Sequence, residues 1–146
     1  MPVTARDLRL AVVPMLAYED PGAAIEWLTR VLGFREQADQ RYTDPDGTIS
    51  HAQMEAGDGV IMLAAPTPDY QSPKHHAATC DAAARWSSVP YVINGVQVQV
   101  DDVDALYERA RAAGASLLSE VQDAPYGRLF RVADLEGQRW MFIQPA

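Results

Sequence analysis

The sequence contains one cysteine, Cys80, and no apolar run of the roughly 20 residues that a membrane-spanning helix needs. A single cysteine cannot form an internal disulfide, which fits a protein of a reducing compartment. The opening stretch, MPVTARDLRL, also lacks the apolar segment of a secretory signal. We therefore expect a cytoplasmic protein.

Positive charge is scarce as well. The chain has 12 lysines and arginines against 20 acidic residues, for a formal net charge of −8. Binding to nucleic acid requires clustered basic side chains that neutralise phosphates, so we expect no nucleic-acid partner, and no membrane partner either. The acidic balance modestly favours cationic ligands through long-range steering. A length of 146 residues predicts a single domain spanning residues 1–146.

The chain repeats one pattern: a strand, an aspartate that caps a helix, and a glycine that ends it. Asp20 and Gly33 are 13 positions apart, as are Asp101 and Gly114. Aspartate accepts hydrogen bonds from free N–H groups at a helix start, and glycine adopts the left-handed conformation of a helix end. Three strands follow each helix. The pattern predicts two βαβββ modules, about 9–65 and 92–146, joined by a linker at 66–91.

The expected elements follow hydrophobic periodicity and turn chemistry. In the first module they are strands at 10–18, 34–43, 49–55 and 60–65 and a helix between Asp20 and Gly33. In the second they are strands at 92–100, 116–121, 128–133 and 139–144 and a helix from Asp101 or Asp102 to 113. The linker holds four prolines, and its length is typical of a functional lid or a flexible tether. We favour a lid with a helical turn at 82–86.

Four stretches in this order resemble the vicinal oxygen chelate superfamily, which includes glyoxalase I and bleomycin-resistance proteins: DPGAAIEWLTRVLGF, HAQMEAGDGVIMLA, GVQVQVDDVDALYERARAAGA and DLEGQRWMFIQP. The resemblance covers nearly the whole chain. It implies an α+β fold in which two βαβββ modules form curled mixed sheets around a cleft. It also implies a homodimer that completes the cleft.

Enzymes of this superfamily hold a divalent metal at four strand positions. The resemblance transfers those positions to Val13, Met62, Gly95 and Met141, with Asn94 as an alternative to Gly95. None of these is a histidine or a carboxylate, the ligands that such metals prefer. We therefore expect neither a metal at this site nor a cofactor.

Strand alternation predicts which side chains line the cleft. If Gly95 faces it, so do Gln97 and Gln99, while the intervening valines pack on the helix. The complete set of predicted ligand-binding residues is Val13, Met15, His51, Gln53, Met62, Trp86, Tyr91, Gly95, Gln97, Gln99, Arg139 and Met141. Trp86 and Tyr91 belong to this set as aromatic residues of the predicted lid.

Simpler explanations exist for several of these residues. The methionines are more often core filler, and glutamines on an alternating strand often face solvent. Trp86 and Tyr91 could pack on the surface. His51 is a weak candidate for a catalytic base, because no acid partner is identifiable, and a structural histidine is the more frequent case.

The segment HHAATC offers His75, His76 and Cys80 as metal donors, but no fourth donor stands at a recognised spacing. We do not expect a metal site there.

The leading hypothesis is a metal-free protein of the bleomycin-resistance type, which sequesters or carries a bulky, partly aromatic small molecule and so contributes to antibiotic resistance. An apolar pocket with a few polar groups suffices for binding. The alternatives are a glyoxalase-like lyase, an isomerase or another enzyme of the superfamily that uses His51 or metal ligands elsewhere, and a purely structural dimeric module.

Overall fold

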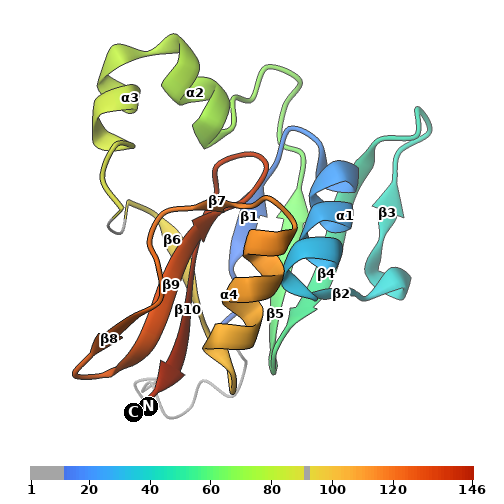
Figure 1. The fold of residues 1–146 in the computed structure, drawn as a ribbon. Coiled ribbons are helices and arrows are strands. Elements are labelled where there is room, and N and C mark those ends of the chain that lie inside the picture. Colours follow the sequence, from blue (N-terminus) through green and yellow to red (C-terminus); the bar gives the residue numbers. More distant parts are fainter. Residues whose placement is uncertain (1–11, 91–92) are drawn as a thin grey trace, which may run out of the picture.

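The computed structural model describes residues 12–90 and 93–146, which form two βαβββ units joined by a helical segment (Figure 1). The first unit contains β1 (Met15–Ala17), α1 (Pro21–Leu32), β2 (Arg35–Glu36), a 3₁₀ turn η2 (Ala38–Gln40), β3 (Tyr42–Thr43), β4 (Ile49–Ala56) and β5 (Gly59–Ala64). The joining segment contains α2 (Pro73–Thr79) and α3 (Asp81–Trp86). The second unit contains β6 (Gly95–Gln99), α4 (Val103–Ala112), β7 (Ser116–Leu117), β8 (Gln122–Ala124), β9 (Gly127–Ala133) and β10 (Arg139–Pro145).

Each unit builds one mixed sheet of the same design. The strand orders are β1-β5-β4-β2 and β6-β10-β9-β7, with β3 added to β4 and β8 added to β9. β1 runs parallel to β5 and β6 parallel to β10, whereas the other pairs are antiparallel. Together with the single long helix of each unit, this arrangement confirms the predicted α+β fold of two βαβββ modules.

Local sequence fixes the ends of the two long helices. The Asp20 carboxylate accepts a hydrogen bond from the Ala23 amide at 3.1 Å, and Pro21 follows at the first helical position. Asp102 caps α4 in the same way, through the Ala105 amide at 3.0 Å. α1 ends at Gly33, whose φ of 74° is left-handed.

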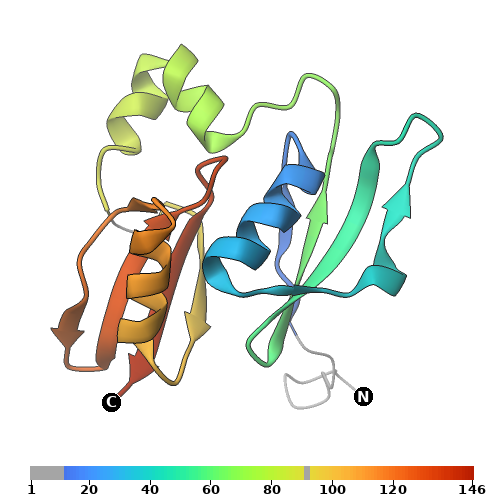
Figure 2. The same cartoon turned by 45° about the vertical axis from the view of Figure 1, so that its right-hand side comes forward.

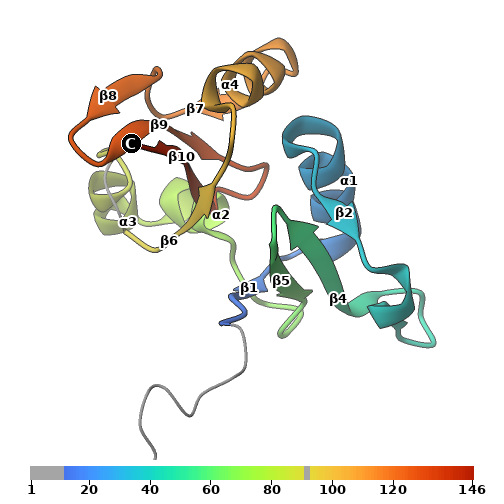
Figure 3. The ribbon, with the colours of Figure 1, turned by 90° about the horizontal axis from the view of Figure 1, so that it is seen from below.

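Helices α1 and α4 each cover one face of their sheet and lie side by side, as Figure 3 shows. Buried side chains of both units form a common core. Phe34 contacts Trp140 and Phe142 edge-on, with ring centroids 5.3 and 6.2 Å apart, so an aromatic cluster joins the two units. Within the described residues, β1 and β6 each pair with one strand only. The two sheets therefore remain separate, with these edges adjoining a groove between the units.

A buried carboxylate, Asp134, binds the two units together. Its Oδ2 accepts hydrogen bonds from the Tyr18 hydroxyl at 2.6 Å and from Trp140 Nε1 at 3.1 Å. Its Oδ1 accepts the backbone amides of Glu136 and Gln138, both at 3.0 Å. Desolvation by burial raises the pKa of Asp134 and of Tyr18. Four donors thus satisfy one acidic side chain that the core would otherwise exclude.

The turn between β9 and β10 also contacts the start of α1. Glu136 accepts the backbone amides of Glu19 at 2.7 Å and Asp20 at 2.9 Å. Gln138 donates through Nε2 to the Ala17 carbonyl at 3.0 Å. This turn of the second unit therefore fixes the loop that leads from β1 into α1.

The sequence predicted most elements, but it did not predict β8, and the strand expected at 10–18 covers only 15–17 among the described residues. The expected strand at 34–43 is two short strands separated by η2, and the one at 116–121 is shortened to β7. The joining segment holds a second helix, α2, whose start at Ser72 and Pro73 is an N-cap followed by proline. None of the helices among residues 12–90 and 93–146 has the length and apolarity to cross a membrane.

Replacing Tyr18 by phenylalanine tests the Asp134 network. Tyr18→Phe removes one buried hydrogen bond to a carboxylate and should lower the free energy of unfolding by about 1.5–3 kcal/mol. The measurement is urea denaturation, with Tyr126→Phe as the control because Tyr126 is exposed. A loss below about 0.5 kcal/mol, the scatter of surface substitutions, would show that the network does not join the units.

Candidate functional site

Three cavities adjoin beside the second sheet, on its face away from α4. Their volumes are about 570, 240 and 400 Å³, and Arg139 at the start of β10 lines all three. The first lies under α2 and α3, the second lies on the sheet face over β6, β9 and β10, and the third follows the groove between β1 and β6. Figure 2 shows the α2–α3 segment standing above the end of this sheet.

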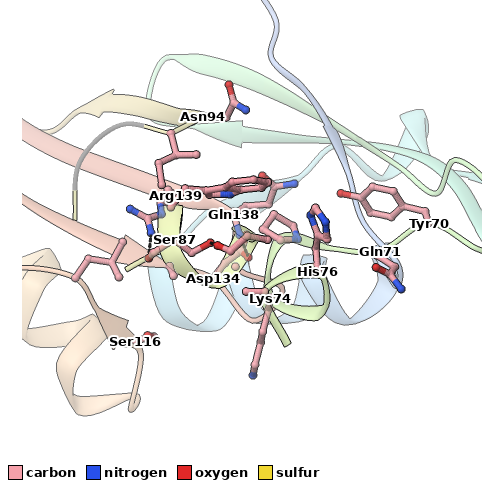
Figure 4. Close-up of a pocket in the computed structure, with 18 residues that line it drawn as sticks. Tyr70, Gln71, Lys74, His76, Ser87, Asn94, Ser116, Asp134, Gln138 and Arg139 are labelled. Carbon is pink, nitrogen blue, oxygen red and sulfur yellow. Dashed lines mark hydrogen bonds between the residues drawn. The ribbon is translucent and has the colours of Figure 1, made fainter. Parts of the chain in front are cut away.

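The first cavity mixes polar and apolar side chains, as Figure 4 shows. Tyr70 and His76 come from the joining segment, whereas Gln138 and Arg139 come from the start of β10. Trp86 also lines it, with 49% of its surface exposed and its ring 5.7 Å from that of His76. Tyr91, the other predicted lid aromatic, lies outside the described residues.

Arg139 holds the end of the joining segment against the sheet. Its Nη2 donates to the Ser87 carbonyl at 2.6 Å, and its Nη1 donates to the Val89 carbonyl. Desolvation by burial lowers the pKa of Arg139. This arginine is therefore a positioning residue for the wall that α3 contributes to the first cavity.

The other end of the segment is anchored by Glu19. Its Oε2 accepts the Ser72 amide at 3.1 Å, and its Oε1 lies 3.1 Å from His75 Nδ1. The hydrogen bond with the Ser72 side chain, followed by the one with His75, lowers the pKa of Glu19. Close approach of the β9–β10 turn adds a further contact, because a side chain at Gly137 would meet the Lys74 backbone nitrogen at 2.8 Å.

The second cavity is lined by a row of side chains across three strands. Met141 of β10 pairs with Gln97 of β6 on one side and with Arg131 of β9 on the other. The sequence predicted Gln97 and Met141 for this face but missed Arg131. Arg131 could have been predicted from the alternation of side chains along the strand at 128–133, if that strand had been paired antiparallel with β10.

Six of the predicted residues line the three cavities, namely Met15, Trp86, Gly95, Gln97, Arg139 and Met141. Five others among the described residues do not line them, namely Val13, His51, Gln53, Met62 and Gln99. Their role in binding stays a prediction.

The corresponding face of the first sheet is open. Met15 pairs with Met62, which pairs with Gln53. Exposed fractions of 39% at Val13 and 75% at Met15 show that little covers this face. The His51 ring contacts Tyr42 with centroids 5.6 Å apart, and within the described residues its nitrogens have no hydrogen-bond partner.

The residues at the predicted metal positions do not fit a divalent ion. Val13 and Gly95 supply no side-chain donor, and the thioethers of Met62 and Met141 are soft and uncharged. Among residues 12–90 and 93–146, no group of three or more His, Cys, Asp or Glu side chains is arranged to hold a metal. We therefore derive no chemistry through a metal at these positions.

Removing the Glu19 carboxylate should release the joining segment. In Glu19→Ala we expect faster hydrogen exchange at residues 72–79, because the Ser72 amide and the His75 ring lose their acceptor. Exchange in β9 should stay unchanged. Mass spectrometry of peptides from both regions measures the difference, with Glu26→Ala on the exposed side of α1 as the control. Equal protection of 72–79 in both variants would contradict the anchoring role.

The chain is similar to known proteins in both sequence and fold. A family model described as the Glyoxalase/Bleomycin resistance protein/Dioxygenase superfamily matches residues 11–142. TioX from Micromonospora sp. ML1 is 36% identical, with a TM-score of 0.66, and the match covers 94% of this chain and 97% of TioX.

Two solved structures at lower identity share the fold. One is the bleomycin-binding protein from bleomycin-producing Streptomyces verticillus, complexed with copper(II)-bleomycin; it is 22% identical over 94% of this chain and 97% of its own, with a TM-score of 0.59. The other is TnmS3, an antibiotic binding protein from Streptomyces sp. CB03234, 17% identical over 95% and 99%, with a TM-score of 0.61. The chain thus belongs to the glyoxalase/bleomycin resistance protein/dioxygenase superfamily.

Proposed function

We propose that this protein binds a bulky, partly aromatic small molecule without using a metal, and so sequesters or carries it. The observation that carries the proposal is the set of adjoining cavities around Arg139 on an open sheet face. Concave, partly apolar sites with a few polar groups are the usual form of small-molecule sites. Binding needs only such a shaped surface, whereas catalysis needs a positioned reactive group.

Two further observations support binding over catalysis. The positions that hold the metal in enzymes of the family carry hydrocarbon and thioether groups here, which do not suit a divalent ion that would polarise a substrate. His51, the candidate base, contacts an aromatic ring and lines none of the three cavities. Proteins of this fold include a bleomycin-binding protein and an antibiotic binding protein, so the fold accommodates this kind of guest. A role in antibiotic resistance, within the cytoplasm, follows as part of the proposal.

The proposal includes a second copy of the chain. Val12 and Met15 are 91% and 75% exposed beside the edge strand β1, and clustered exposed apolar side chains mark association surfaces. A partner placed over this face would convert the open groove into a closed cleft.

Native mass spectrometry should show a species of twice the chain mass in wild type and a monomer in Met15→Glu, with Glu26→Lys as the surface control. A monomeric wild type at micromolar concentration would contradict this part.

Truncating Trp86 tests the binding proposal. Isothermal titration with the uncharged planar probe anthraquinone-2-carboxamide should show binding to wild type. Trp86→Ala should weaken it by roughly 3–10-fold, because an aromatic contact contributes about 0.5–1.5 kcal/mol beyond area burial. Tyr126→Ala, which removes an exposed aromatic ring outside the three cavities, is the control. Unchanged affinity in Trp86→Ala would remove this residue from the site.

A further inference from the structure

Arg131 differs from the other arginines that face the second sheet or its helix. Its side chain lies on the cavity face of β9, opposite Met141, and lines the cavity of about 240 Å³. Within residues 12–90 and 93–146 the guanidinium forms no hydrogen bond and no ion pair. Its Nε is shielded from solvent and has no partner. A buried hydrogen-bond donor without an acceptor destabilises the folded protein, and a bound acceptor would remove that cost.

The other arginines on the second sheet and on α4 have structural partners. Arg128, on the opposite face of the same strand, pairs with Asp104 and Asp123, both at 2.9 Å. Arg111 pairs with Glu108 at 2.9 Å, and Arg139 donates to backbone carbonyls of the joining segment. Arg131 therefore has no structural partner that would explain an arginine at this position.

The residues that line the cavity beside Arg131 include no acidic side chain, in a chain whose formal net charge is −8. Three rows of paired residues cross β6, β10 and β9 on this face, and none includes an acidic side chain: Gly95, Arg139 and Ala133; Gln97, Met141 and Arg131; Gln99, Ile143 and Leu129. Two of these nine residues are arginines. The lining of this cavity is therefore locally basic although the whole molecule is acidic.

We propose that Arg131 binds an anionic group of the guest, a carboxylate attached to a flat, largely apolar body. The guanidinium is a planar fork whose N–H groups match the two oxygens of a carboxylate. Gln97 and Met141 lie in the same row, so they supply an amide and a polarizable thioether for the rest of the molecule. This inference rests on the binding function proposed above and adds the chemical class of its ligand.

A matched pair of probes separates charge from shape. Anthraquinone-2-carboxylate and its uncharged carboxamide have the same ring system and nearly the same size. Isothermal titration at pH 7.5 should show the carboxylate binding wild type about 10-fold more tightly, the ratio expected from one charge-assisted hydrogen bond. In Arg131→Met the preference should fall to about 1, while the affinity for the carboxamide stays unchanged.

Two further variants distinguish the site from general electrostatics. Arg111→Met removes the same charge from exposed α4 and should keep the preference. Arg131→Lys keeps the charge but loses the fork, so an intermediate preference is expected. Thermal melting completes the test: the midpoint of Arg131→Met should be no lower than that of wild type, because no structural hydrogen bond is lost.

Each outcome of these measurements either supports or overturns the role of Arg131 in binding a carboxylate. Equal binding of both probes to wild type, or a carboxylate preference that survives in Arg131→Met, overturns the inference and leaves the binding function intact. A large drop in the melting midpoint of Arg131→Met shows that the arginine is structural, which also overturns it. If neither probe binds wild type at millimolar concentration, the proposed function fails and the inference fails with it.

Discussion

The arrangement of the protein depends on one buried carboxylate. Asp134 accepts hydrogen bonds from the side chains of Tyr18 and Trp140 and from two amides of its own turn, so it joins residues 116 positions apart in the chain. Its turn then holds the start of α1 through Glu136. The two sheets share no paired edge within the described residues, so these contacts, the aromatic cluster around Phe34 and the hydrogen bonds from Arg109 to the end of α1 hold the units together. The groove between β1 and β6 exists as a result.

The proposed binding face follows from the alternation of side chains along the strands. Trp140 and Phe142 pack in the core with the helices, so their neighbours Arg139 and Met141 must lie on the opposite face. Helix α4 covers the first of these faces, and the α2–α3 segment partly covers the second. The same alternation that builds the core therefore leaves a row of Gln97, Met141 and Arg131 available to a guest. In members that bind a metal such a face would carry imidazole and carboxylate groups; here it carries thioethers, amides and guanidinium groups.

Local signals in the sequence predicted much of the fold. The aspartate caps and Gly33 defined the long helices, and alternation placed Gln97 and Met141 on one face with Trp140 on the other. Three features depend on contacts distant in sequence and were not predicted. The Asp134 network requires knowing that Tyr18 lies nearby, and Arg131 requires the register between β9 and β10. The first cavity requires the position of α2, whose start signal, Ser72 followed by Pro73, lies inside the predicted linker.

The most direct test of a metal-independent binding site is to locate a bound probe on protein treated with a chelator. Titration of ¹⁵N-labelled, EDTA-treated protein with anthraquinone-2-carboxylate, followed by amide chemical shifts, reports where the probe lies. We expect saturable changes in amide chemical shift at Gly95–Gln99, Arg131 and Arg139–Met141, and no change in β4. Shifts confined to the first sheet around His51, or binding that appears only when a divalent metal is restored, would contradict it.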